Sequence, residues 1–286
     1  PIVERRGFIV RVTSSDPERP QHLYSDACPL PGFSKDTLDD VHAALAAPFA
    51  LQRPPSLDWA LYATHCWSDE PCTPPTALLL GDGDDGLDAI DGLVDGGTVK
   101  LKVGRRALAD DLARVDHAAT VVRQRRGHLR LDGNRRLDVD AAIALADAAG
   151  GVLEFFEEPV IVSKQKQLPS SFPLALDEWI DELRERGGVR RLPKAAAWIV
   201  KPTVLGSSAT LEVVNAARGS KVKLVISSAY ESAVGRQSLG CFARFVDTML
   251  HREHVVHGLG TGPAFADDID VTALDALPWR VWKQPR

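Results

Sequence analysis

Ionisable side chains stand at or near the ends of five successive apolar segments of this sequence. The first segment, TVKLKV at 98–103, carries Lys100 and Lys102. The four segments that follow end in ionisable residues spaced 20 to 30 residues apart, namely Asp132, Glu157 with Glu158, Asp177 with Glu178, and Lys201. Carboxylate oxygens are the ligands that Mg²⁺ prefers, and lysine can take or return a proton. These residue types could remove a proton next to a substrate carboxylate while a metal ion stabilises the enediolate.

The segments that carry these residues have the length and composition of buried strands. Eight such runs follow one another: TALLL (76–80), TVKLKV (98–103), HLRLD (128–132), VLEFFEE (152–158), PLALD (173–177), AWIVK (197–201), KVKLVISS (221–228) and, weakly, HVVHG (254–258). Helical patterns lie between several of them, at 107–126, 138–150 and 208–219, whereas the link after VLEFFEEP is poor in helix signals. Strands that alternate with helices pair in parallel, so we predict an α/β fold with a (β/α)₈ barrel of the TIM type.

The barrel prediction places the ionisable residues together. All strands of such a barrel end at one face, and that face holds the active site. Alternation within TVKLKV puts Val99, Leu101 and Val103 on the helix-facing side, and Lys100 and Lys102 on the inner side. The same parity turns Arg130 and Asp132 inward in the next strand. A purely structural network of buried ion pairs would show a similar pattern and stays open as an alternative.

The first 70 residues do not show this alternation of strands and helices. Two strand-like runs, ERRGFIVRVTSSD and QHLYSDACP, flank a polar turn, and a loop and two helices follow. We therefore expect an α+β capping domain at 1–73, a catalytic barrel at 74–262, and a C-terminal tail at 263–286 that packs back on the cap. Because Pro1 is not an initiator Met, we also expect the numbering to begin inside a longer gene product.

Composition narrows the functional classes. The chain has 286 residues and a net charge of −5 with the charges spread along it, which argues against nucleic acid as a partner. It has neither an apolar run long enough for a transmembrane helix nor a signal-peptide layout, so no membrane partner is expected. The four cysteines, Cys28, Cys66, Cys72 and Cys241, form no CxxC pair and suit a reducing cytoplasm.

The motifs KLKVG, LRLDGNR, FFEEP, ALDE and IVKPT, in that order and spacing, resemble the muconate-lactonizing branch of the enolase superfamily. SDACPLPGFSKDTLDD and ISSAYESAVGRQSLGCFA resemble more specifically the o-succinylbenzoate synthase family. The resemblance runs from about Arg5 to about Gly262. It departs at Ala229, where the family has a third serine. It also departs at the N-terminus, where we expect the first strand of the capping sheet and part of a mobile loop to be missing or very short. The contacts of the cap with substrate therefore stay open.

The resemblance implies a role for each matching residue. Lys102 would be the base that removes the proton and then the acid that protonates the leaving hydroxyl, and Lys201 would stabilise the enediolate. Asp132, Glu157 and Asp177 would bind Mg²⁺, with Mn²⁺ as a possible substitute. The residues that would support these groups are Lys100, Asn134, Glu158 and Glu178. Those that would hold the substrate are Ser227, Ser228, Gly258, Gly260 and Thr261.

The reaction that the resemblance implies is the loss of water from 2-succinyl-6-hydroxy-2,4-cyclohexadiene-1-carboxylate, a step of menaquinone biosynthesis that gives 2-succinylbenzoate. An N-succinylamino acid racemase is the nearest alternative, because it would use the same two lysines. A barrel kept only as a binding module is a further alternative. The small-molecule substrate is the expected partner, and the sequence leaves the oligomeric state open.

Overall fold

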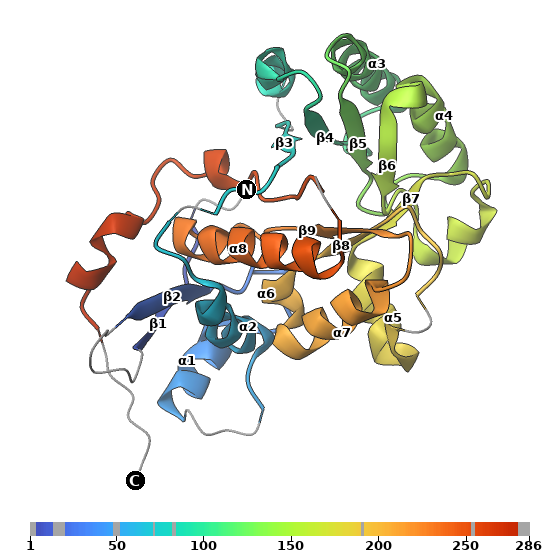
Figure 1. The fold of residues 1–286 in the computed structure, drawn as a ribbon. Helices are drawn as coiled ribbons and strands as arrows, with labels where there is room; N and C mark the ends of the chain where they lie inside the picture. Colours follow the sequence, from blue (N-terminus) through green and yellow to red (C-terminus); the bar gives the residue numbers. More distant parts are fainter. Residues whose placement is uncertain are drawn as a thin grey trace. The chain divides into compact units, whose positions relative to one another are not determined.

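The computed structural model describes residues 4–13, 21–47, 52–70, 72–81, 84–189, 192–252 and 255–279 (Figure 1). The chain divides into two compact units, which are described in turn. The sheet unit comprises Pro75–Ile199 and Gly219–Val225. The mixed unit comprises Pro1–Pro74, Val200–Arg218 and Ile226–Arg286. The chain passes from the sheet unit into the mixed unit at the last residues of two strands, Val200 and Ile226.

The sheet unit is built on seven strands in sequence order. They are β3 (Leu78–Leu79), β4 (Thr98–Lys102), β5 (His128–Asp132), β6 (Leu153–Glu157), β7 (Leu174–Leu176), β8 (Ala197–Val200) and β9 (Lys223–Ile226). The pairs from β3 to β8 are parallel. The predicted parallel α/β architecture is therefore confirmed.

Helices cover the outer face of β4, β5 and β6 (Figure 1). The helices of this unit are α3 (Leu108–Gln124), α4 (Val139–Ala149) and α5 (Glu178–Gly187), with 3₁₀ turns η2 (Asp84–Gly92), η3 (Gly150–Val152) and η4 (Val162–Gln167). Val99, Leu101 and Val103 are fully buried in one cluster with Val115 and Val122 of α3. This packing confirms the predicted outer side of β4, and the single 3₁₀ segment η4 agrees with the weak helix signal after β6.

The eighth predicted strand is wrong as a strand. His254 lies outside the described residues, and in the rest of HVVHG only His257 and Gly258 are bridge residues, with Gly258 paired to Ser227. The ring of His257 explains the loss. Its Nδ1 accepts the N–H of Ile226 at 3.1 Å, and its Nε2 contacts Asp247 at 3.1 Å. A side chain thus takes the backbone donor that a strand ladder would use.

The mixed unit contains the predicted pair of strands, β1 (Phe8–Thr13) and β2 (His22–Ala27), which the structure shows to be antiparallel. The polar turn between them lies outside the described residues. Its helices are α1 (Leu38–Ala46), α2 (Pro55–Ala63), α6 (Pro202–Leu205), α7 (Ser207–Ala217) and α8 (Ala233–Met249). Short 3₁₀ turns complete it, η1 (Thr64–Cys66), η6 (Gly262–Ala264) and η7 (Val271–Ala276). No helix in the described part of the chain is long and apolar enough to cross a membrane.

The described part of the C-terminal tail packs on β2. Leu274 and Trp279 belong to a cluster with Tyr24, and the Tyr24 hydroxyl donates to Asp275 at 2.5 Å. The guanidinium of Arg11 lies 4.2 Å from the centre of the Trp279 ring. Residues 280–286 lie outside the described part.

Two buried carboxyl groups lie where β2 meets the start of α8. Asp26 accepts the N–H and the hydroxyl of Ser232, at 2.8 and 2.6 Å. Glu231 accepts the N–H of Ala229 at 2.7 Å. Burial raises the pKa of Glu231 to about 7, and the nearby charge of Asp26 adds to the shift. Burial also raises the pKa of Asp26. Burial at this position therefore disfavours the charged form of both carboxyls.

Leu131→Ala tests the core between the sheet and its helices. Leu131 is fully buried in β5, so we expect a loss of about 2–5 kcal/mol in the free energy of unfolding. Val94→Ala, at a largely exposed site of the same unit, is the control and should stay within about 0.5 kcal/mol of wild type. Urea unfolding followed by circular dichroism measures both. Equal effects would contradict the assigned core.

Glu231→Gln tests the buried acid pair through the pH dependence of stability. The folded pKa of Glu231 is raised from 4.5 to about 7, so its contribution is complete below pH 4.5 and is lost as pH rises through 7. Relative to the variant, wild type should lose about 2–3 kcal/mol of unfolding free energy between pH 5 and 8. Glu4→Gln, at an exposed glutamate, should show no such trend. A pH-independent difference for Glu231→Gln would contradict the assignment.

Candidate active site

The register of the parallel strands places three predicted site residues side by side. Lys102 of β4 pairs with Asp132 of β5, and Asp132 pairs with Glu157 of β6. Neighbouring strands lie about 4.8 Å apart, so the side chains at these positions share one edge of the sheet. Asp177 follows β7 directly and extends the row to a third carboxylate. All three carboxylates are at most 7% exposed.

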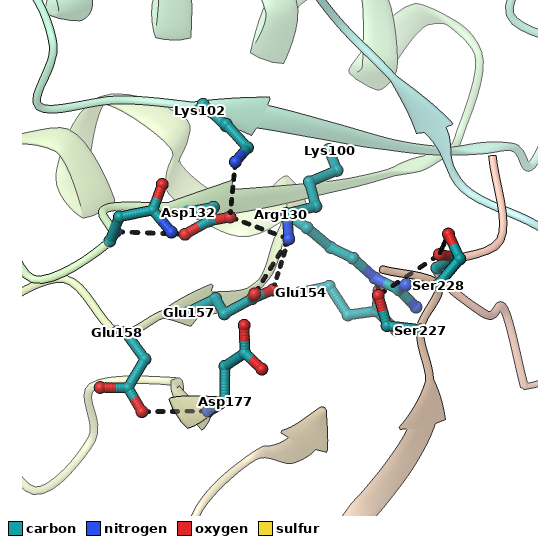
Figure 2. Close-up of polar contacts among 12 residues, drawn as sticks. Lys100, Lys102, Arg130, Asp132, Glu154, Glu157, Glu158, Asp177, Ser227 and Ser228 are labelled. Atoms are coloured by element: carbon teal, nitrogen blue, oxygen red, sulfur yellow. Dashed lines mark hydrogen bonds and ion pairs between the residues drawn. The ribbon is translucent and has the colours of Figure 1, made fainter. Parts of the chain in front are cut away.

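Lys100 lies between two of these carboxylates (Figure 2). Its Nζ is 2.9 Å from Asp132 Oδ2 and donates to both oxygens of Glu157, at 2.8 and 2.9 Å. Burial by itself lowers the pKa of Lys100, but the charges of Asp132, Glu157 and Asp177 outweigh it and hold this pKa above its ordinary value. The surrounding carboxylates therefore favour the charged form of Lys100.

Lys102 lies on the same side of the strand in a different electrostatic environment. Its Nζ is 4.0 Å from Asp132 Oδ2, a contact that Figure 2 marks. Burial lowers the pKa of Lys102, the positive charges of Lys100 and Arg105 lower it further, and Asp132 only partly opposes them. A lysine with a lowered pKa reaches its neutral, basic form more readily. The two lysines of KLK thus differ in what they can do.

The side chain of Glu158 binds the backbone just after β7, where Asp177 lies. Its Oε1 accepts the backbone N–H groups of Asp177 and Trp179, at 3.0 and 3.1 Å. Its Oε2 accepts Nε of Arg135 at 2.8 Å and the amide of Gln165 at 3.3 Å. Asp177 is the N-cap residue of α5, which Glu178 begins, but its side chain makes no capping hydrogen bond. The carboxylate of Asp177 is therefore not used to start the helix.

The turn after β5 is shaped by close backbone contacts. A Cβ on Gly133 would lie 2.7 Å from Cα of Pro159, so only glycine fits there. Asn134 follows with φ of 42°, and its N–H donates to Asp132 Oδ1 at 3.1 Å. Glu158 has φ of 40°. Non-glycine residues rarely adopt positive φ, and such strain is typical of functional sites.

Deeper in the sheet lies a network that the sequence pattern did not reveal. Arg130 is buried, and its Nε donates to Glu154 at 2.5 Å while its guanidinium lies over the ring of Phe155. Lys223 pairs with the other oxygen of Glu154. Burial alone raises the pKa of Glu154, but Arg130 and Lys223 outweigh it and lower this pKa.

Strict alternation along β6 would turn the side chain of Glu154 toward the helices. The register shift between β5 and β6 at Leu129/Arg130 is the irregularity that brings it inside.

The donor set of this edge suits a hard divalent cation. Three buried carboxylates from neighbouring strands supply only oxygen ligands. Asp132 and Glu157 already converge on a cation, the ammonium of Lys100. As the side chains stand, no group of three or more His, Cys, Asp or Glu within the described residues is arranged to hold a metal ion. The residues thus fit Mg²⁺ by their chemistry, with Lys100 between two of the ligands.

Lys201, in the mixed unit, directly follows β8 and precedes α6. Its Nζ lies 4.9 Å from the centre of the Phe33 ring. This is a cation–π contact, which is strongest away from water. Phe33 belongs to the PLPGFS turn, where the N–H groups of Phe33 and Ser34 donate to Leu30 O at 3.0 and 2.8 Å. The sequence showed this turn as part of a family motif but did not show its contact with Lys201.

The predicted substrate-holding residues lie together within the mixed unit. The hydroxyls of Ser227 and Ser228 each donate to Gly258 O at 3.3 Å. Ser228 Oγ is also 2.8 Å from Thr261 Oγ1. A Cβ on Gly258 would lie 2.7 Å from Ser227 Oγ, so a larger residue there would displace this hydroxyl. Gly260 lies in the turn between these partners.

Sequence comparison gives the family. The pattern of the enolase C-terminal domain-like family matches residues 92–274. The o-succinylbenzoate synthase of Haemophilus influenzae is 27% identical over 274 residues, covering 85% of this chain and 79% of that protein. The o-succinylbenzoate synthase of Vibrio cholerae is 27% identical over 306 residues, covering 97% and 86%.

Solved structures share the fold. The o-succinylbenzoate synthase of Thermosynechococcus elongatus BP-1, complexed with Mg in its active site, has a TM-score of 0.66 at 20% identity, covering 95% of this chain and 91% of that one. A dipeptide epimerase of Methylococcus capsulatus, complexed with Mg and a dipeptide, has a TM-score of 0.66 at 18% identity, covering 91% and 84%. One fold thus serves different reactions. The chain belongs to the enolase superfamily, in the branch of mandelate racemase and muconate lactonizing enzyme.

Proposed function

We propose that this protein is an o-succinylbenzoate synthase, which removes water from 2-succinyl-6-hydroxy-2,4-cyclohexadiene-1-carboxylate with the help of Mg²⁺. The observation that carries the proposal is the row of Lys102, Asp132 and Glu157 in register on three neighbouring strands. A base beside oxygen ligands is the arrangement needed to take a proton next to a carboxylate. The relatives at 27% identity support the choice of substrate.

The residues of the sheet unit divide the work. Lys102 Nζ takes the proton α to the substrate carboxylate and then returns a proton to the leaving hydroxyl, so that the C–O bond breaks and water departs. Asp132, Glu157 and Asp177 would hold Mg²⁺, which stabilises the negative charge that develops on the carboxylate. Lys100 keeps Asp132 and Glu157 charged, and Glu158 holds Asp177 through its backbone N–H.

The residues of the mixed unit take their roles from the family motifs. Lys201 would balance the charge of the enediolate, and its contact with Phe33 supports this role because it keeps the side chain in a defined orientation. Ser227 and Ser228 offer hydroxyls held by Gly258 and Thr261, which suits polar groups of a succinyl side chain.

Two assays on the purified protein with Mg²⁺ test the proposal. We expect 2-succinylbenzoate to form from the cyclohexadiene substrate, measured by the absorbance of the aromatic product. The second assay offers an N-succinylamino acid and follows optical rotation. Rapid racemisation without any succinylbenzoate would overturn the proposal in favour of the racemase. No turnover in either assay would favour a binding module.

Lys102→Ala should lower kcat for dehydration by about 10²–10⁴-fold, because the proton at carbon loses its base. Lys166→Ala, at an exposed lysine of η4, is the matched control and should keep wild-type kcat. Circular dichroism and Mg²⁺ titration should show that the Lys102 variant stays folded and still binds the metal. Wild-type turnover in Lys102→Ala would remove this residue from the mechanism.

Chelation with EDTA should abolish turnover, and added Mg²⁺ or Mn²⁺ should restore it, because three acidic ligands release their metal to a stronger chelator. Calorimetry should show weaker Mg²⁺ binding in Asp132→Asn, which removes a ligand charge. Asp140→Asn, at an exposed position of α4, should bind as wild type does. Activity that survives EDTA would contradict the metal site.

A further inference from the structure

Arg5 precedes β1 in the mixed unit and makes four hydrogen bonds, all to backbone carbonyls. Two of them reach the segment that begins the PLPGFS turn, with Nη1 donating to Pro29 O and Nη2 to Cys28 O, each at 2.7 Å. The other two reach the segment after Ser228, with Nη2 donating to Ala229 O at 3.3 Å and Nε to Tyr230 O at 3.1 Å. One guanidinium thus joins two segments about 200 residues apart in sequence.

Each of these segments is held internally as well. In the first, Leu30 N–H donates to Ser34 Oγ at 2.8 Å and Gly32 has φ of 74°, which forms a tight turn. In the second, Tyr230 has φ of 61°, and Ala229 N–H donates to Glu231. Each turn is thus held by hydrogen bonds of its own, and two hydrogen bonds from Ser232 to Asp26 join the chain beside them. The four bonds of Arg5 add a direct link from one turn to the other.

The two turns carry groups that the proposed function needs. Phe33, in the first, contacts Lys201, and Ser227 and Ser228 directly precede the second. We propose that Arg5 is a positioning residue that sets the spacing between the Phe33 turn and the serine pair, and through it the affinity for substrate. This inference rests on the proposed function for its kinetic consequence, but its structural consequence stands apart from it.

The chemistry of the side chain explains why arginine stands here. A planar guanidinium offers five N–H donors in a fixed fork, whereas lysine offers three on a single nitrogen. Lysine at this position could keep a positive charge near Asp26 but could not reach four carbonyls in two directions. We therefore expect Arg5→Lys to lie between wild type and Arg5→Ala.

Kinetics on the Mg²⁺-loaded protein give the first test. Arg5→Ala should raise KM for the cyclohexadiene substrate by at least about tenfold and lower kcat much less, because the base and metal ligands are unchanged. Arg6→Ala is the matched control, since Arg6 is exposed and its side chain contacts only the exposed Glu4 among the described residues. Millimolar guanidinium should restore part of the lost affinity in Arg5→Ala. Wild-type KM in both Arg5 variants would overturn the proposal.

Hydrogen exchange gives the second test, which does not depend on turnover. Amides of residues 30–34 and 228–232 should exchange faster in Arg5→Ala and Arg5→Lys than in wild type or Arg6→Ala. A raised KM with unchanged exchange would mean that Arg5 acts on substrate directly, and would overturn the positioning role. If wild type makes no succinylbenzoate, the proposed function fails, while faster exchange at both turns would still support Arg5 as their link.

Discussion

Repulsion among buried carboxylates is the constraint around which the sheet unit is built. Asp132, Glu157 and Asp177 lie at the ends of neighbouring strands, where little water screens their charges. The ammonium of Lys100 offsets this repulsion by direct contact with two of them. The same contact gives the two lysines of β4 different protonation behaviour. Lys100 is held in its charged form, and its charge helps to lower the pKa of Lys102. Lys100 can thus act as a counter-ion, and Lys102, two residues further along the same strand, is better suited to act as a base.

A second layer of contacts keeps the row of carboxylates in place. Glu158 holds the backbone at Asp177, and Arg135 in turn pairs with Glu158 and with Glu182. Asn134, Arg135 and Glu158 all have positive φ. Such conformations persist only where the surrounding contacts impose them. These three residues lie in the two turns that follow Asp132 and Glu157.

The mixed unit also contains two neighbouring buried carboxyl groups, Asp26 and Glu231. Burial raises the pKa of both Asp26 and Glu231, and no lysine contact comparable to that of Lys100 is seen at them among the described residues. Arg5 lies near Asp26, yet its hydrogen bonds go to carbonyl groups of two turns. The guanidinium of Arg5 in this unit thus fastens loops, whereas the ammonium of Lys100 in the sheet unit holds two carboxylates together.

The sequence by itself determined the parallel sheet, the outer side of β4 and the family, because these depend on local periodicity and on motifs. The alternation of TVKLKV was enough to place Leu101 among the helices, and the family motifs named Lys102 and the three carboxylates. Only the tertiary structure decided which lysine contacts which carboxylate, that Glu154 turns inward at a bulge, and that His257 replaces a strand bond. It alone showed that Arg5 joins turns far apart in the chain. Periodicity shows which residues share a face of one helix or strand. The contacts named above depend on strand register and on the approach of segments far apart in sequence, which no local pattern encodes.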